Sequence, residues 1–133
     1  MVYNLPDVTI QHIDILLFKQ INTGLANPVL DWIMLAASAL GTGAAQVALC
    51  LVLALFGWVL DRASLRKAGY AGLIACALGS IAAQVAKGVF DRPRPLAVLF
   101  DARAVGHPLF WGSFPSGHAL TVFAVAAAAS GFV

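Results

Sequence analysis

Residues 43–60 read GAAQVALCLVLALFGWVL, and residues 68–86 read AGYAGLIACALGSIAAQVA. The first run is interrupted only by Gln46, and the second is almost as apolar. A helix that crosses a bilayer needs about 20 predominantly apolar residues. The two runs therefore predict membrane spans, and they indicate an all-α integral membrane helix bundle.

The composition of the whole chain agrees with this class. Of the 133 residues, 61% are hydrophobic and 11% are charged, and the formal net charge is +2. A soluble domain carries about 25% charged residues. These values exclude a disordered tail and a nucleic-acid-binding arm. Cys50 and Cys76 lie inside the apolar runs, which favours small buried side chains over a disulfide or a metal site.

Two further helices are predicted from their starting residues. Asn27 and Pro28 are a good N-cap and first helical residue for a helix over Val29–Leu40. From Gly117 to Val133 the chain is again apolar and helical. With the two runs above, about four hydrophobic helical segments are expected. Residues 8–20 are partly amphipathic, and they fit either a helix on the membrane surface or the beginning of the first span.

The second apolar run carries two stripes. Small residues recur at three- and four-residue steps, which allows two helix backbones to approach closely; they are Gly72, Cys76, Gly79 and Ala83. Beside them Ser80, Gln84 and Lys87 form a polar stripe, which should face the bundle interior or water. Lys87 then reaches an internal site, or alternatively it is a helix-end residue whose amine reaches the headgroups.

The segment Pro115-Ser116-Gly117-His118 has the features of an anion site at a helix start. Ser116 can cap the helix, and Gly117 lets a ligand approach the backbone. The unpaired N–H groups and the helix dipole favour a phosphate there. His118 falls in the first turn, where its imidazole can donate a proton to a leaving oxygen.

The segment Lys87-x6-Arg94-Pro95 supplies cations on the same side of the predicted bundle. Pro93 and Pro95 stiffen the chain on both sides of Arg94. The guanidinium is a planar fork that matches phosphate oxygens, and the amine is a point charge. Converging with Ser116 and His118, these groups would form a phosphoryl-transfer site.

These two motifs resemble those of the type 2 phosphatidic acid phosphatases, the PAP2 superfamily, which includes bacterial undecaprenyl-diphosphatases. The resemblance implies that Lys87 and Arg94 bind the phosphate, that Ser116 and Gly117 contact it, and that His118 protonates the departing group. It also implies that no metal or other cofactor is needed.

The third motif of that family, Ser-Arg-x5-His-x3-Asp, has no counterpart in this sequence. Its histidine is the nucleophile that forms a phosphohistidine, and no Arg, His or Asp follows His118 here. We therefore expect residues 1–133 to be a single PAP2-like membrane domain that is truncated at its C-terminal end. We also expect these residues alone to show no turnover.

The expected function is hydrolysis of a lipid phosphate or diphosphate, with membrane lipids as partners and no nucleic acid. The form of the first motif favours a polyprenyl diphosphate, and phosphatidate and phosphatidylglycerophosphate are close alternatives. Arg62, Arg66 and Lys67 predict a cytoplasmic turn. The site would then lie on the outer face of a multi-pass protein in the inner (plasma) membrane. A non-catalytic lipid-phosphate-binding protein and a structural or transporter bundle are the alternatives.

Other ionisable residues have simpler interpretations. Asp31 lies near a helix start, where the dipole favours an acid. Its pair Leu30-Asp31, like Ile21-Asn22, also resembles the start of small bacterial members of the family. His107 is expected to be a loop residue, and Arg92 and Arg103 are expected to be surface charges.

Overall fold

The computed structural model describes the backbone of residues 8–132 and the side chains of residues 12–132. Every regular element in that part of the chain is helical, which confirms the all-α prediction. The elements are α1 (Val8–Lys19), the π-helical turn η1 (Gln20–Gly24), α2 (Pro28–Leu40), α3 (Gly43–Val59), α4 (Ala63–Phe90), α5 (Pro95–Val98) and α6 (Gly117–Ser130).

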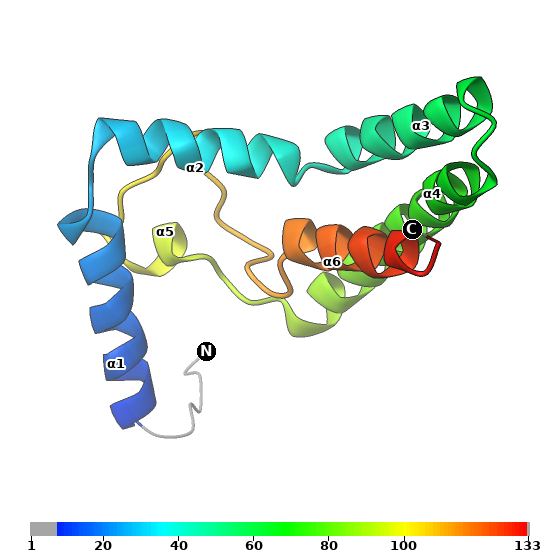
Figure 1. Cartoon of the computed structure of the whole chain (residues 1–133). Coiled ribbons are helices and arrows are strands. Elements are labelled where there is room, and N and C mark those ends of the chain that lie inside the picture. The colour runs from blue at the N-terminus through cyan, green and yellow to red at the C-terminus, as the bar shows by residue number, and fades with distance from the viewer. Residues whose placement is uncertain (1–7, 133) are drawn as a thin grey trace.

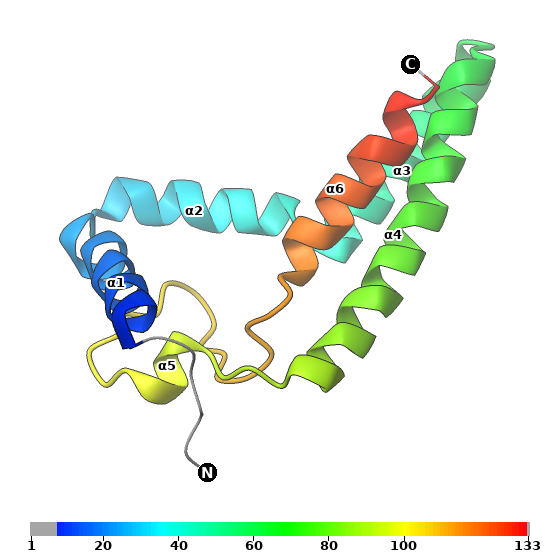
Figure 2. The same cartoon turned by 90° about the horizontal axis from the view of Figure 1, so that it is seen from below.

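Helices α3, α4 and α6 lie side by side and form the packed part of the molecule (Figure 1, Figure 2). Its centre is the cluster of Cys50, Cys76 and Val125, against which Leu73 packs. Cys50 and Cys76 are both buried, as predicted, with free thiols. Most large apolar side chains of the three helices point outward instead, which suits a surface covered by lipid.

Glycines on α4 allow the three backbones to approach closely. A Cβ on Gly69 would lie 2.7 Å from the amide nitrogen of Ala54, and one on Gly72 would lie 2.5 Å from Sγ of Cys50. On the α6 side, a Cβ on Gly79 would lie 3.1 Å from Leu120. The predicted small-residue stripe is therefore the surface by which α4 packs against both neighbours.

The boundaries predicted for the second span were too narrow. Residues 61–67 were expected to form a polar turn, but α4 already begins at Ala63 and continues to Phe90. Arg66 lies inside its first turns, where it pairs with Asp61 at 3.2 Å and stacks over Trp58. The helix ends where Asp91 adopts a left-handed conformation with φ 36°, a conformation that Asp tolerates better than most residues.

Two helix starts were predicted correctly. The Asn27 side chain accepts a hydrogen bond from the amide of Val29 at 2.8 Å, and Pro28 is the first residue of α2. The Ser116 side chain likewise accepts from the amide of Ala119 at 3.3 Å. Helix α6 ends at Ser130, however, before the Val133 that we expected it to reach.

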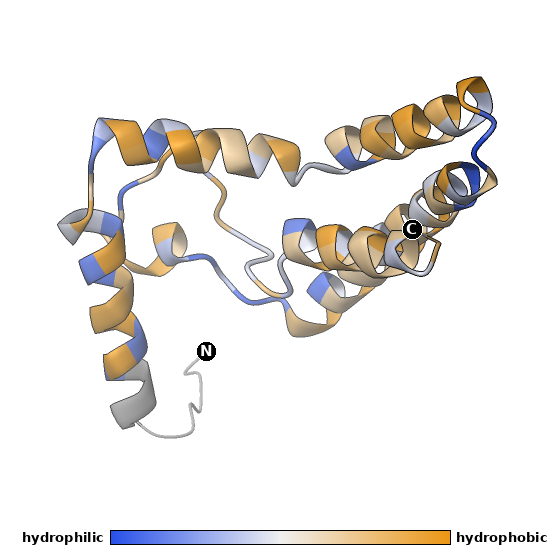
Figure 3. Ribbon diagram, in the orientation of Figure 1, coloured by the Kyte–Doolittle hydropathy of each residue, from blue (hydrophilic) through white to orange (hydrophobic). Residues whose placement is uncertain are grey.

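The capacity to cross a membrane differs among the described helices. Ala63–Val98 is long and apolar enough, and the pair His12–Gly24 and Pro28–Leu40 passes together although it is bent by 112°. Gly43–Val59 and Gly117–Ser130 are apolar but shorter. Figure 3 shows hydrophilic residues in the α3–α4 turn and in the segment after α4.

A polar clamp fastens the segment after α4 to the N-terminal helices. We use this name for the ion pairs Asp14–Arg92, Lys19–Asp101 and Asp31–Arg103, together with Asn22. Asn22 donates to the Arg103 carbonyl at 2.9 Å and accepts from the Arg103 amide at 2.7 Å. Arg92 and Arg103 were expected to be plain surface charges. The structure adds that each of them forms an ion pair with a carboxylate.

Candidate phosphate site

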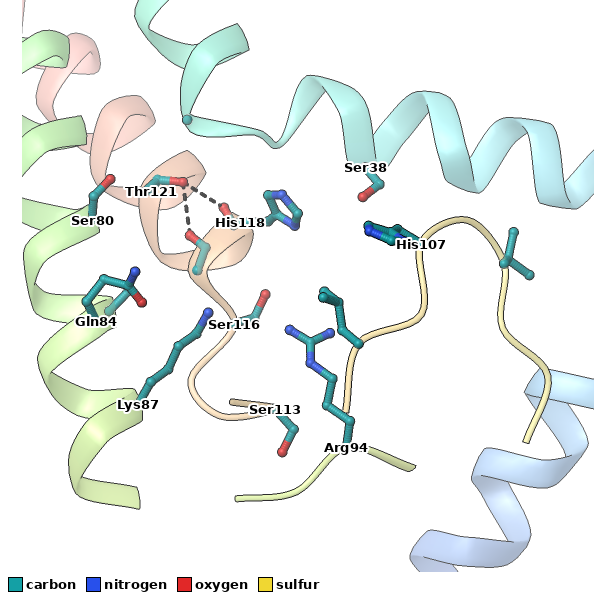
Figure 4. A pocket seen from close by; sticks show the side chains of 15 residues that line it. Ser38, Ser80, Gln84, Lys87, Arg94, His107, Ser113, Ser116, His118 and Thr121 are labelled. Carbon is teal, nitrogen blue, oxygen red and sulfur yellow. Dashed lines mark hydrogen bonds between the residues drawn. The ribbon is translucent and has the colours of Figure 1, made fainter. Parts of the chain in front are cut away.

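One pocket of about 510 Å³ lies between the start of α6, the end of α4 and the long segment that joins them (Figure 4). Its lining includes all five residues selected from the sequence, namely Lys87, Arg94, Ser116, Gly117 and His118. They come from two helices and a loop, so the fold brings both motifs to one place.

Lys87 reaches the pocket from the last turns of α4 (Figure 4). Gln84 lies about one helical turn before it and Ser80 about two turns before it, and both also line the pocket. The stripe predicted from the sequence thus lines this pocket. For Lys87, the structure favours that arrangement over the alternative in which the amine reaches the headgroups.

The start of α6 lies beside the amine of Lys87. A Cβ on Gly117 would lie 3.6 Å from Nζ of Lys87, so a larger residue would occupy the space beside the amine. Thr121, which is buried, donates its hydroxyl to the Gly117 carbonyl at 3.0 Å. Ser116 and Gly117 both line the pocket, so the N-terminal end of α6 borders it, and an anion is favoured at such an end.

His118 is positioned by a close contact with the α2–α3 junction. Gly41 is buried there, and a Cβ added to it would lie 3.3 Å from Cβ of His118. Gln46 stabilises the same junction by donating its side-chain amide to the Leu40 carbonyl at 2.8 Å. The imidazole therefore projects into the pocket from a supported position (Figure 4).

Arg94 is held by the chain that leads into the second motif. Its Nε donates to the Trp111 carbonyl at 2.9 Å, and one terminal nitrogen donates to the Gly112 carbonyl at 3.4 Å. Its backbone amide also donates to Phe110 at 2.8 Å. The remaining guanidinium N–H groups point toward Ser116 (Figure 4), so the fork is oriented before any anion binds.

The electrostatics of the pocket favour an anion. No Asp belongs to the lining, and within residues 12–132 neither Lys87 nor Arg94 forms an ion pair with a carboxylate. In the same part of the chain, no three His, Cys or Asp side chains lie close enough together to hold a metal ion. Two cations and a helix start therefore face a pocket without a counter-charge.

The structure also adds residues that the sequence analysis did not assign to the site. Ser38 of α2 and His107 line the pocket, although His107 was expected to be only a loop residue. No local signal marks them, because they belong to separate segments of the chain. The imidazole next to Pro108 was visible as a titratable group, but nothing in the sequence placed it near α2.

The family model of the PAP2 superfamily matches residues 68–133. The matched segment contains both motifs with the five selected site residues, together with most of α4 and all of α6. No curated protein and no solved structure matches the chain. The match supports a helical membrane fold and a phosphatase-like function on lipid phosphates.

Proposed function

We propose that the chain binds the phosphate of a membrane lipid and takes part in its hydrolysis. The observation that carries this proposal is the meeting of Lys87, Arg94 and the Ser116–His118 helix start around one pocket without an acidic residue. The two cations would neutralise the phosphate oxygens, and the helix start would hold them through its amide groups.

In this proposal His118 is the general acid. As the bond between phosphorus and the leaving oxygen breaks, the imidazolium proton moves to that oxygen. The nucleophile of the family's third motif is not among the residues after His118. The proposal therefore assigns phosphate binding and leaving-group protonation to these residues, and it assigns the attacking group to none of them.

The substrate that we propose is a lipid carrying a phosphate or diphosphate headgroup. A polyprenyl diphosphate such as undecaprenyl diphosphate is favoured by the Arg-Pro-Arg-Pro form of the first motif at residues 92–95. Phosphatidate and phosphatidylglycerophosphate remain the competing substrates. We place the reaction at the outer face of the inner (plasma) membrane, because Arg62 before α4 and Arg66 and Lys67 in its first turns favour the cytoplasmic side for that end of the helix.

Binding of inorganic phosphate to the purified chain in detergent, followed by titration calorimetry, tests this proposal. Lys87→Ala and Arg94→Ala should each weaken binding by about tenfold or more, the effect of losing a charge-assisted hydrogen bond. Lys67→Ala is the matched control, because Lys67 lies on the same helix at its opposite end. Equal affinities in all variants would contradict the proposal and favour a structural or transporter bundle.

A non-catalytic lipid-phosphate-binding protein is the second candidate, because the residues assigned to the site bind phosphate and supply an acid but no nucleophile. The two candidates differ in turnover. We expect the chain alone to bind phosphate but to release none from a lipid phosphate. Phosphate release that is abolished by His118→Ala would show instead that these residues suffice for catalysis.

A further inference from the structure

The pocket extends beyond the two motifs, and its far wall is polar. Ser38 of α2 and His107 of the long loop lie there, on the opposite side of the pocket from Lys87 (Figure 4). Val105 and Leu109 flank His107 in the same wall. The wall therefore combines two hydrogen-bonding side chains with an apolar rim, an arrangement typical of a ligand-binding surface.

The loop that carries His107 is held in place by contacts of the residues just before His107 in the chain. Arg103 is held through its side chain by Asp31 and through its backbone by Asn22. Gly106 has φ +85°, and a Cβ at that position would lie 2.9 Å from Leu35 of α2. The polar clamp and this close approach keep His107 beside Ser38, and both residues line the pocket while remaining exposed to solvent.

The chemistry of this wall suits a second anionic group. A neutral imidazole offers one N–H donor, and a serine hydroxyl offers another. Among the hydrogen bonds and ion pairs of residues 12–132, none involves the side chain of His107, so its donor is available to a ligand. When the first phosphate binds at Lys87 and the α6 start, this wall can contact the next group of the headgroup.

We propose that His107 and Ser38 form a second subsite, which binds the next phosphate of a lipid diphosphate and makes the pocket prefer diphosphates over monophosphates. The inference rests on the proposed function, because it presupposes that the first phosphate binds at Lys87 and Arg94. His107 is here a specificity-determining residue, whereas His118 remains the acid.

Titration calorimetry with two soluble probes tests this subsite on the purified chain in detergent. The probes are inorganic phosphate and methylenediphosphonate, whose P–C–P link cannot be hydrolysed. The measured quantity is the ratio of the two affinities. His107→Ala should lower the preference for diphosphonate by about tenfold, and Ser38→Ala should lower it in the same direction by a smaller factor.

Two further variants control for indirect effects. His107→Gln keeps a side-chain donor and should retain most of the preference. His12→Ala removes an exposed histidine of α1 that does not line the pocket, and it should leave the ratio unchanged.

The outcomes separate this inference from the function on which it rests. If the unaltered chain binds neither probe, both proposals fail. If it binds both probes in a Lys87-dependent manner but His107→Ala changes the ratio no more than His12→Ala does, only the second subsite is overturned. A lowered ratio in both His107→Ala and Ser38→Ala supports it.

Discussion

Two parts of the molecule hold their shape by different interactions. The bundle of α3, α4 and α6 is joined by glycine, alanine and cysteine at backbone contact distance, as at Gly69 and Gly72. The N-terminal helices and the long loop are joined instead by the polar clamp, whose members are largely exposed. One part is held by packing and the other by paired charges.

This difference separates the two walls of the pocket. Lys87 and the α6 start belong to helices of the packed bundle, so the close packing of α4 and α6 supports the first phosphate position. His107 depends on the clamp, and exposed ion pairs contribute little individually. The proposed phosphate site at Lys87 and the α6 start should therefore be rigid, and the proposed second subsite at His107 and Ser38 should be more mobile.

The largest effect is expected from a methyl group inside the bundle. Gly69→Ala puts a Cβ 2.7 Å from two backbone atoms of α3, and overpacking of this kind costs about 1–3 kcal/mol. Thermal unfolding in detergent measures the loss. Gly88→Ala is the matched control on the same helix, since no atom lies within 4 Å of its added Cβ. Equal unfolding temperatures for the two variants would contradict the packing argument.

The next effect concerns the N-caps of α2 and α6. Ser116→Ala and Asn27→Ala should each lower stability by about 1 kcal/mol through loss of an N-cap. Ser116→Asp keeps a capping oxygen but adds negative charge, so it should preserve stability and abolish phosphate binding. Asn27→Ala should lower stability without changing phosphate affinity. Tight phosphate binding by Ser116→Asp would show that the α6 start is not the anion site.

A smaller effect is expected when the clamp loses one charge. Asp31→Asn removes the partner of Arg103, so amide exchange over residues 103–109 should rise by up to about fivefold. Hydrogen exchange followed by mass spectrometry measures this change. Asp61→Asn, in the ion pair with Arg66 at the other end of the molecule, should leave that segment unchanged. No difference between the two variants would show that the clamp does not hold the loop.

The smallest effect is the pH dependence of the Lys19–Asp101 pair. The hydrogen bond from Lys19 holds the pKa of Asp101 below its usual value of 3.8. A carboxyl group with a lowered pKa stabilises the fold above 3.8, and this contribution is lost as the pH falls through the lowered value. Unfolding temperatures of the chain and of Asp101→Asn should therefore differ slightly near neutral pH and converge well below 3.8. A constant difference would contradict this pairing.

Local signals in the sequence predicted much of this structure. The N-caps at Asn27 and Ser116 are contacts within three residues, so a short motif suffices to locate them. The small-residue stripe of α4 is periodic, and it predicted the packed face correctly. The start of α4 was misplaced because the charges of Arg66 and Lys67 resemble those of a turn, although a helix also accommodates them.

The clamp and the far wall of the pocket could not be predicted in this way. Asp31 and Arg103 are separated by 72 positions in the chain, and no periodicity connects them. Asp31 lies on α2 and Arg103 on the long loop, so their pairing depends on how the tertiary structure places α2 against that loop. His107 and Ser38 meet for the same reason, so their proximity is a property of the tertiary structure.

The hydrogen bonds between residues 92–94 and 110–113 give the two motifs a common frame. Arg94 is anchored to Phe110, Trp111 and Gly112, and the Ser113 amide donates to Arg92 at 3.0 Å. Residues 95–109 therefore form a loop whose two ends are held together by these hydrogen bonds. This loop can vary in length and sequence during evolution while the proposed phosphate site at Lys87, Arg94 and the α6 start stays intact. New headgroup preferences can then arise by exchanging this loop alone.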